Sequence, residues 1–203
     1  MLIETIKIQN REIFNIEYHN KRLNLSRFNL FGVSSIIDLR EYLSPPNDNR
    51  LYRCRVVYER DIIKVEYIPY SPKNQQNFII VESDIEYSYK YSNRDKLNLL
   101  KDRYSDYDDI IISQNGLLKD TTIANIAFLD NGVWITPKMP LLYGTIRSKM
   151  IDEGTLIPQD IYSRDINNFS GFAIMNAMIG FKIIKNPSIR RVDENRYTKY
   201  KRV

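Results

Sequence analysis

Few residue types in this chain can act directly as reactive groups. Its 203 residues include one histidine, His19, and one cysteine, Cys54. A zinc site of the usual nitrogen and sulfur ligands therefore cannot be built, and any Ser-His-Asp or Cys-His nucleophile system would depend on His19. The sequence also has only seven glycines and no glycine-rich phosphate loop. If the protein is an enzyme, lysine, aspartate, glutamate, arginine or tyrosine must do the chemistry, or a cofactor must.

Pyridoxal phosphate is a cofactor that uses these residue types. It needs a lysine for a Schiff base, a carboxylate beside the pyridine nitrogen, phosphate donors at a helix N-terminus and often an arginine. The chain has many lysines and acids, so composition alone selects none of them. Order and spacing have to decide.

Six segments follow one another in the order of the motifs of a known family. They are Glu4-Thr5, His19-Asn20-Lys21-Arg22-Leu23 with Ser26, Lys90-Tyr91-Ser92-Asn93-Arg94, Asp120-Thr121-Thr122-Ile123-Ala124-Asn125, Thr136-Pro137 with Leu141-Leu142-Tyr143-Gly144-Thr145-Ile146-Arg147, and Asn176-Ala177-Met178. Together they resemble the class IV aminotransferases, the family of branched-chain and D-amino acid aminotransferases and of aminodeoxychorismate lyase. The resemblance covers roughly residues 3–185.

The resemblance implies a role for each matching position. Lys90 would form the Schiff base and then move the α-proton of the substrate, a step that requires a neutral amine. Asp120 would hold the pyridine nitrogen protonated, where the family usually has the longer glutamate. Arg22 would donate to the phosphate, with His19 packing or bonding behind it. The cofactor-binding residues implied in this way are Arg22, Lys90, Asp120, Asn125, Thr145, Ile146, Asn176 and Ala177.

Two further pairs would complete the phosphate site. Thr145 and Ile146 would offer backbone N–H groups at a helix N-terminus, where the helix dipole also favours an anion. The order here is Gly-Thr-Ile, whereas the family has Gly-Ile-Thr. Asn176 and Ala177 would supply the remaining donors, the structural alternative being an ordinary buried strand end.

Substrate residues are implied less directly. Arg53, Arg55 and Arg60 flank the hairpin that forms the active-site side of the smaller domain in similar proteins. One of them could bind a carboxylate bidentately, and the alternative for each is a charge on an edge strand or a turn. Tyr91, next to the lysine, could line the pocket. We therefore expect a small-molecule amino substrate.

The reaction divides into two alternatives. In aminodeoxychorismate lyase, deprotonation is followed by loss of pyruvate and formation of 4-aminobenzoate, a step of folate biosynthesis. In a branched-chain or D-amino acid aminotransferase the proton returns to the cofactor and a keto acid leaves. The Lys-x-x-Asn-Arg form and the Asn-Ala-Met segment favour the lyase. Relatives usually have a longer stretch before the Glu-Thr strand, and that stretch normally helps to shape the substrate side of the site. The identity of the substrate is therefore not settled by the motifs. The competing classes are a non-catalytic family member and a basic module that binds nucleic acid.

The hydrophobic patterns predict the elements that must position these residues. We expect strands, some joined by Asn-Gly hairpin turns, and helices over the following ranges: strands 2–8 and 13–18, a helix from His19 capped by Gly32, a helix from Ser34 or Ser35 to Ser44, a hairpin of 51–58 and 62–68, strand 78–82, helix 92–101, strands 109–113, 117–121, 125–130 and 133–136, helix 145–153, and strands 171–175 and 181–184.

The resulting fold class is mixed α/β. By resemblance it is a two-domain fold like that of D-amino acid aminotransferase, with the cofactor in the cleft between domains. The domains would span 1–75 and 85–203, with a linker at about 71–88 that includes Pro72. Relatives are usually homodimers.

Charge and hydropathy bound the partners. The net charge is +5, but basic and acidic residues are interleaved, and the cluster from Arg190 to Arg202 is interpreted as a solvated tail, which argues against a nucleic acid partner. No targeting segment is visible, and the most apolar window, Phe172 to Phe181, is about half of the ~20 residues that a membrane span needs. A lone cysteine fits a reducing compartment. We therefore predict a cytoplasmic protein with no membrane association.

Overall fold

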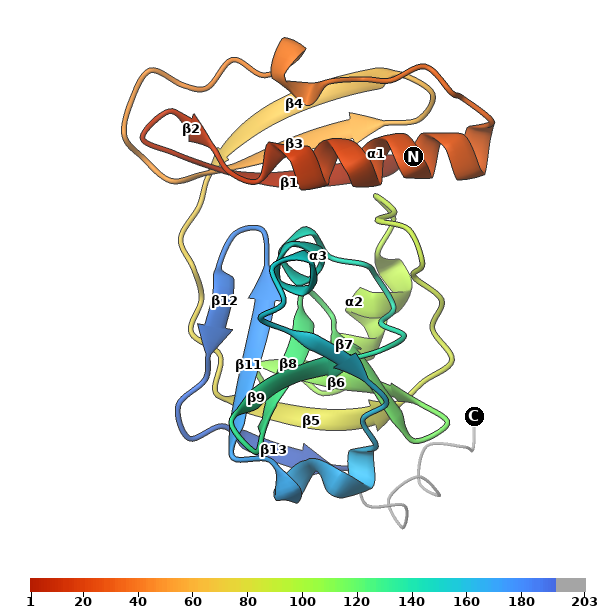
Figure 1. Ribbon diagram of the computed structural model, residues 1–203, viewed down its shortest axis with the longest axis vertical. Helices are drawn as coiled ribbons and strands as arrows, with labels where there is room; N and C mark the ends of the chain where they lie inside the picture. The colour runs from red at the N-terminus through yellow and green to blue at the C-terminus, as the bar shows by residue number, and fades with distance from the viewer. Residues whose placement is uncertain (193–203) are drawn as a thin grey trace.

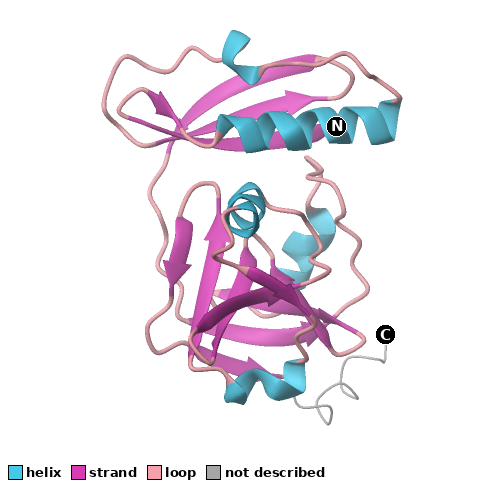
Figure 2. Cartoon of the chain, viewed as in Figure 1, coloured by secondary structure: helices cyan, strands magenta, loops and turns pink. Residues whose placement is uncertain are grey.

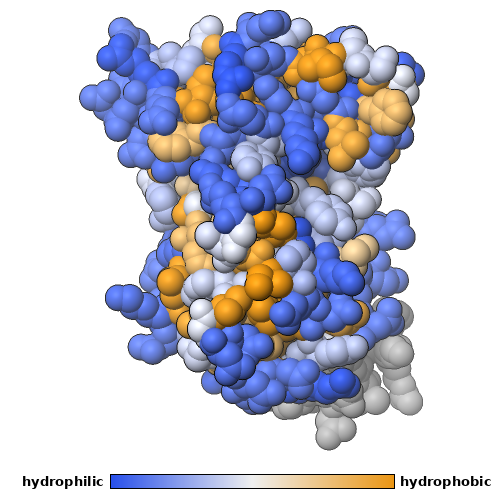
Figure 3. Space-filling model, viewed as in Figure 1, coloured by the Kyte–Doolittle hydropathy of each residue, from blue (hydrophilic) through white to orange (hydrophobic). Residues whose placement is uncertain are grey.

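Two β-sheets with helices around them form the chain over residues 1–192, which are the residues that this computed structural model describes. In Figure 1 the N-terminal sheet lies above the larger C-terminal sheet, and Figure 2 shows the mixture of helix and strand in both parts. The predicted mixed α/β class is confirmed. In the space-filling view, apolar side chains are interspersed among polar ones over both parts (Figure 3).

The N-terminal sheet has four strands in the order β2-β1-β3-β4, all antiparallel. Its elements are β1 (Leu2–Gln9), β2 (Glu12–Ile13), α1 (Ile16–Phe31), β3 (Tyr52–Tyr58) and β4 (Ile62–Pro69). Along β3, Tyr52, Cys54 and Val56 are buried in the core beneath α1. Because side chains alternate along a strand, Arg53 and Arg55 lie on the opposite face of the sheet.

The return strand predicted at 13–18 is wrong beyond Ile13. Asn15 adopts a left-handed conformation with φ 53°, which ends the extended run and allows α1 to begin at Ile16. Asparagine tolerates this conformation better than most residues. The predicted end of the helix is confirmed, because Gly32 has φ 67° and its N–H bonds to the carbonyl oxygens of Arg27 and Phe28.

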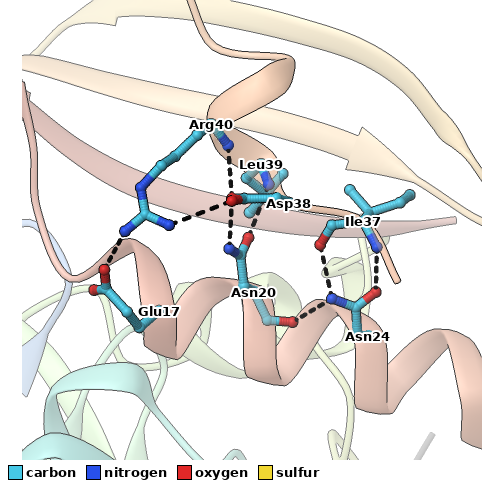
Figure 4. Close-up of polar contacts among 7 residues, drawn as sticks. All are labelled: Glu17, Asn20, Asn24, Ile37, Asp38, Leu39 and Arg40. Carbon is cyan, nitrogen blue, oxygen red and sulfur yellow. Dashed lines mark hydrogen bonds and ion pairs between the residues drawn. The ribbon is translucent and has the colours of Figure 1, made fainter. Parts of the chain in front are cut away.

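The helix predicted from Ser34 or Ser35 to Ser44 is also wrong. That stretch contains only a short 3-10 turn, η1 (Leu39–Glu41). Figure 4 shows the reason: Asn24 on α1 binds both the carbonyl oxygen and the N–H of Ile37, at 2.8 and 2.9 Å. Asn20 in turn accepts from the N–H of Leu39 and donates to Asp38. Two asparagines on α1 thus hold this backbone extended, because they satisfy groups that a helix would have bonded within itself.

The C-terminal sheet has nine strands. Its elements in chain order are β5 (Asn77–Glu82), α2 (Asp95–Asp102), β6 (Asp109–Gln114), β7 (Leu117–Thr121), β8 (Asn125–Asp130), β9 (Val133–Pro137), α3 (Thr145–Asp152), β10 (Ile157–Gln159), η2 (Ser163–Asn168), β11 (Gly171–Asn176), β12 (Gly180–Ile183) and β13 (Ser188–Arg191). Asn115-Gly116 and Asn131-Gly132 turn the predicted hairpins with positive φ at all four residues. The predicted hairpins and the helix at α3 are confirmed.

Two short strands of this sheet were not predicted. β10 pairs in parallel with β9, and β13 pairs in parallel with β5, so both lie at edges of the sheet. β13 contains Arg190 and Arg191, the start of the predicted solvated tail, whereas residues 193–203 lie outside the described residues. The division into domains at 1–75 and 85–203 stays a prediction; β5 lies inside the predicted linker range and belongs to the C-terminal sheet.

The two sheets are joined by more than the chain between them. The segment after β5 returns to the N-terminal sheet, where the N–H of Ile3 donates to the carbonyl oxygen of Lys90 at 2.9 Å and Leu2 forms a β-bridge with Tyr91. Helices α1 and α3 also contact each other. Among the described residues, no helix has the length and apolar character needed to span a membrane.

Candidate active site

A cavity of about 430 Å³ lies between the N-terminal and C-terminal parts of the chain. Residues of both parts line it, including Ile3 and Arg53 from the N-terminal sheet and Met175 from the C-terminal one. Nine of the site residues predicted from the sequence meet in its wall. These are Arg22, Arg53, Arg55, Lys90, Asp120, Asn125, Thr145, Asn176 and Ala177.

Lys90 is half-buried and is positioned by the backbone bond to Ile3 described above. Burial lowers the pKa of its ammonium to about 7, and the nearby Arg22 guanidinium adds to the shift, while Glu4 opposes it. A lysine with such a pKa is substantially neutral near pH 7. It can therefore act as a nucleophile or accept a proton, which an ordinary surface lysine cannot.

Asp120, the penultimate residue of β7, is a buried carboxylate with 4% exposure. Burial raises its pKa to about 6, against the hydrogen bonds that favour its charged form. Its Oδ1 accepts from the amide of Asn125 at 2.7 Å, and its Oδ2 accepts from the N–H of Leu142 at 2.9 Å. No ion pair to Asp120 is formed within residues 1–192. The charge of Arg147 acts on Asp120 without forming an ion pair, so a cationic group in the cavity would supply a direct partner.

Asn125 has a second task beside Asp120. Its Nδ2 also donates to the carbonyl oxygen of Leu142 at 2.8 Å. Its Oδ1 lies where a β-carbon on Gly144 would fall, at 2.0 Å from that position. Glycine is therefore required at 144 because a β-carbon there would clash with Asn125. The backbone conformation does not require it, since a φ of −73° is available to any residue. The close approach packs the start of α3 against the Asp120 carboxylate.

Arg22 is held by a fully buried glutamate. Its Nε donates to Glu4 Oε1 at 2.9 Å and its Nη2 to Glu4 Oε2 at 2.5 Å, a bidentate pair. His19 Nδ1 also lies 2.6 Å from Glu4 Oε2. These partners lower the pKa of Glu4 to about 2 against the opposing effect of burial. Burial lowers the pKa of His19, so Nδ1–H donates and Nε2 is left bare and buried. His19 is a framework residue here.

The arginine and the start of α3 converge. Arg22 Nη1 donates to the carbonyl oxygen of Tyr143, 3.4 Å away and just before α3. A guanidinium has five N–H groups, so two remain for a ligand. Thr145 lines the cavity, while the side chain of Ile146 packs into the core against Ala127 and Met175. Any contribution of Ile146 must therefore come from its backbone N–H, as predicted.

Asn176 is occupied differently from the prediction. Its Oδ1 accepts from the N–H groups of Met178 and Ile179, and its Nδ2 donates to the carbonyl oxygen of Ile123. The side chain thus builds the turn between β11 and β12, with one amide N–H left. Ala177, in the middle of that turn, lines the cavity.

Two predicted substrate residues lie outside the cavity lining. Arg60 is exposed in the turn between β3 and β4, where its carbonyl oxygen accepts from Arg27 Nε at 2.7 Å. The ring of Tyr91 packs against the cores of both parts. Tyr87 takes the lining position instead, with its hydroxyl donating to the carbonyl oxygen of Tyr91 at 2.8 Å.

Several lining residues were given no role from the sequence, among them Tyr70, Tyr87 and Arg94. Tyr70 follows β4 directly, and its position could not be inferred without the fold. Arg94 belongs to the lysine motif and is the N-cap residue of α2. A cation at a helix N-terminus is electrostatically unfavourable, and this was the available signal that the residue has another task.

The residues of the cavity fit pyridoxal phosphate. A lysine with a lowered pKa, a buried carboxylate that forms no ion pair within residues 1–192, and an arginine beside a helix N-terminus occur in one cavity. These are the groups that bind the carbonyl, the pyridine nitrogen and the phosphate. Asp120 in place of glutamate is compatible with this arrangement, because it is fixed by two hydrogen bonds and lines the cavity itself.

Comparison with known proteins gives the class. The family model for amino-transferase class IV matches residues 1–186, so the chain belongs to the class IV aminotransferases, which are pyridoxal-phosphate-dependent enzymes. An uncharacterised protein of Haemophilus influenzae is 36% identical over 184 residues, which are 88% of this chain and 98% of that protein.

Two further relatives carry more specific names. A crystal structure from Haemophilus somnus, provisionally named a 4-amino-4-deoxychorismate lyase, is 32% identical with a TM-score of 0.80 and is matched over 88% of this chain and 96% of that one. A protein of Schizosaccharomyces pombe, provisionally named an aminodeoxychorismate lyase, is 36% identical over 61 residues, which are 29% of this chain and 26% of that protein. The predicted family and enzyme class are thereby confirmed.

Proposed function

We propose that this protein is a pyridoxal-phosphate-dependent lyase that resembles 4-amino-4-deoxychorismate lyase and forms 4-aminobenzoate and pyruvate for folate biosynthesis. The observation that carries the proposal is the presence of Lys90 and Asp120 in the wall of one cavity, each with a pKa moved toward neutrality. Perturbed titratable groups in a cleft indicate a functional site. The lyase is favoured over transamination by the name of the relative at 32% identity and by the Lys-x-x-Asn-Arg motif.

In the proposed mechanism each of these groups has a defined role. When bound, pyridoxal phosphate supplies an electron-withdrawing ring that stabilises negative charge at the carbon bearing the amino group. Lys90 Nζ would hold the cofactor, and its neutral amine would accept the proton from that carbon. Asp120 would orient the ring nitrogen and keep it protonated, while Arg22 and the N–H groups that open α3 would hold the phosphate. Partial burial of Lys90 and the charge of Arg22 favour its neutral amine.

The family match also favours a second candidate, an amino acid aminotransferase. The two reactions differ in product. The lyase releases pyruvate and 4-aminobenzoate from aminodeoxychorismate without a second substrate, whereas the aminotransferase transfers the amino group to 2-oxoglutarate. We further propose that the protein is cytoplasmic and that it is a homodimer, as relatives usually are. Light scattering would test the oligomeric state.

The decisive experiment begins with the cofactor. Purified protein mixed with pyridoxal phosphate should develop an absorption band at the edge of the visible range, and Lys90→Ala should abolish it. The matched control is Lys96→Ala, because Lys96 is exposed on α2 outside the cavity lining. A wild-type protein that stays colourless refutes cofactor binding. A coloured protein that releases no pyruvate from aminodeoxychorismate but transfers amino groups refutes the lyase alone.

A further inference from the structure

The cavity contains more positive charge than its own acids neutralise. Its wall holds several basic side chains and a single acidic one. The basic residues are Arg22, Arg53, Arg55, Lys90 and Arg94, and the acidic residue is Asp120. Two of the arginines already have carboxylate partners, since Arg22 is paired with Glu4 and Arg55 with Glu66. Arg53 and Arg94 form no ion pair within the described residues.

The strand that carries Arg53 fixes its backbone and directs its side chain toward the cavity. It is the second residue of β3, paired in register with Lys7 and Ile68 on the two neighbouring strands, so its backbone is fixed. Its side chain projects from the face of the sheet opposite to α1 and lines the cavity. The Nε atom is buried and has no hydrogen-bond partner in the part of the chain that is described. An unpaired buried donor is costly, so a ligand that accepts from it regains that loss.

Arg94 stands at the N-terminus of α2, on the C-terminal side of the cavity. Its Nη2 donates to the carbonyl oxygen of Thr122 at 2.6 Å, and its guanidinium lies over the Tyr87 ring, with 5.7 Å to the centroid. These contacts fix the group but leave its charge unneutralised. The positive charge also helps to lower the pKa of Lys90, which places it near the reacting amine.

The Arg22 site, with its spare N–H groups beside α3, provides for the phosphate, so two guanidiniums remain. One belongs to the N-terminal sheet and the other to the C-terminal part. A guanidinium matches the geometry of a carboxylate, with two parallel N–H donors facing two oxygens. A ligand with one carboxylate would leave one of the two positive charges without a partner.

We propose that Arg53 and Arg94 are specificity-determining residues that bind the two carboxylates of a dicarboxylate amino substrate, one from each side of the cavity. The inference rests on the proposed function, because it names the substrate class of the same site. With both arginines paired, the site would prefer dicarboxylate substrates to the branched-chain and other monocarboxylate amino acids that class IV aminotransferases also use.

The test uses protein loaded with pyridoxal phosphate and two unreactive probes, isophthalate and benzoate, which differ by one carboxylate. Titration calorimetry in a phosphate-free buffer should show isophthalate binding roughly 10- to 100-fold more tightly than benzoate, as one added charge-assisted pair implies. Arg53→Gln and Arg94→Gln should each reduce isophthalate affinity to nearly that of benzoate. Arg60→Gln is the matched control, because Arg60 lies outside the cavity lining, and it should keep the full preference.

Each other outcome decides against the inference. Equal binding of both probes to the wild type overturns it, as does an unchanged preference in either glutamine variant. An Arg94→Gln protein that shifts the cofactor's absorption band yet keeps its preference would show that Arg94 acts on the cofactor. Circular dichroism and the cofactor band verify that each variant is folded and loaded. If the wild type takes up no cofactor, the proposed function fails, and the probe preference of the unloaded protein still tests the two arginines.

Discussion

Replacing Gly144 by alanine should damage the site through a single contact. The added methyl group would lie 2.0 Å from Asn125 Oδ1, so the Asn125 side chain must move. That movement breaks its hydrogen bonds to Asp120 and to the carbonyl oxygen of Leu142, at 2.7 and 2.8 Å. Each buried hydrogen bond contributes about 1–1.5 kcal/mol, and stranded partners add to the loss, so we expect a destabilisation of about 2–4 kcal/mol.

The assay is urea denaturation, analysed as a double-mutant cycle with Asn125→Ala. In the Asn125→Ala background the obstructing oxygen is gone, and Gly144 has an ordinary φ of −73°. Gly144→Ala should there be neutral or stabilising by up to about 1 kcal/mol, through its effect on the unfolded chain. The reasoning is refuted if Gly144→Ala is as stable as the wild type, or if it costs the same in both backgrounds.

Three further changes have defined expectations. Glu4→Gln should lower the free energy of unfolding by about 3 kcal/mol at pH 7, because the folded pKa of Glu4 is depressed from 4.5 to about 2. This contribution is present above pH 4.5 and is lost as the pH falls toward 2. If the denaturation midpoints of the variant and the wild type differ equally at pH 7 and pH 2, the pairing with Arg22 is contradicted. Asn24→Ala removes both bonds to the backbone of Ile37 and should lower stability by about 1–3 kcal/mol in thermal unfolding, with an unchanged melting curve as the opposing result. Burial raises the pKa of the Cys54 thiol to about 12, so iodoacetamide should leave the folded protein unmodified and react only after urea is added; rapid labelling of native protein would show that the thiol is accessible.

Most of the strands could be predicted because the residues that indicate them are close neighbours in the sequence. Alternation of apolar residues marked β3 and β4, and Asn115-Gly116 and Asn131-Gly132 marked hairpin turns, since these pairs adopt positive φ readily. Gly32 ended α1 as expected for the same reason. These elements needed no knowledge of their neighbours.

The failures occurred where distant residues decide the backbone. The stretch that includes Ile37 has residues suited to a helix, but Asn20 and Asn24 on α1 bind its backbone in extended form. β13 forms only because β5 offers a parallel edge more than 100 residues earlier, as the pairing of Ile189 with Phe78 shows. Neither interaction leaves a trace in a short window of sequence.

The candidate site, like the fold, could be predicted only in part from the sequence. Lys90, Asp120 and Arg22 were identified through motif order, and the structure brings them into one cavity. The pKa values that make Lys90 reactive could not be inferred, because they depend on burial and on charges far along the chain. Tyr91 was expected in the cavity because it follows Lys90 in the sequence, yet Tyr87, three residues before the lysine, is the tyrosine that lines it. Adjacency in sequence therefore did not identify the lining residue.

The backbone bond between Ile3 and Lys90 has a mechanical consequence. This N–H···O bond fixes the backbone of Lys90 to β1, and β1 pairs along its length with β3, which carries Arg53. Lys90 and Arg53 are therefore both anchored to the N-terminal sheet, whereas Asp120 belongs to β7 of the C-terminal sheet. Any shift of one sheet against the other changes the distance from Lys90 to Asp120 before it changes the distance from Lys90 to Arg53. Slow hydrogen exchange at the Ile3 amide would report that the bond to Lys90 is intact.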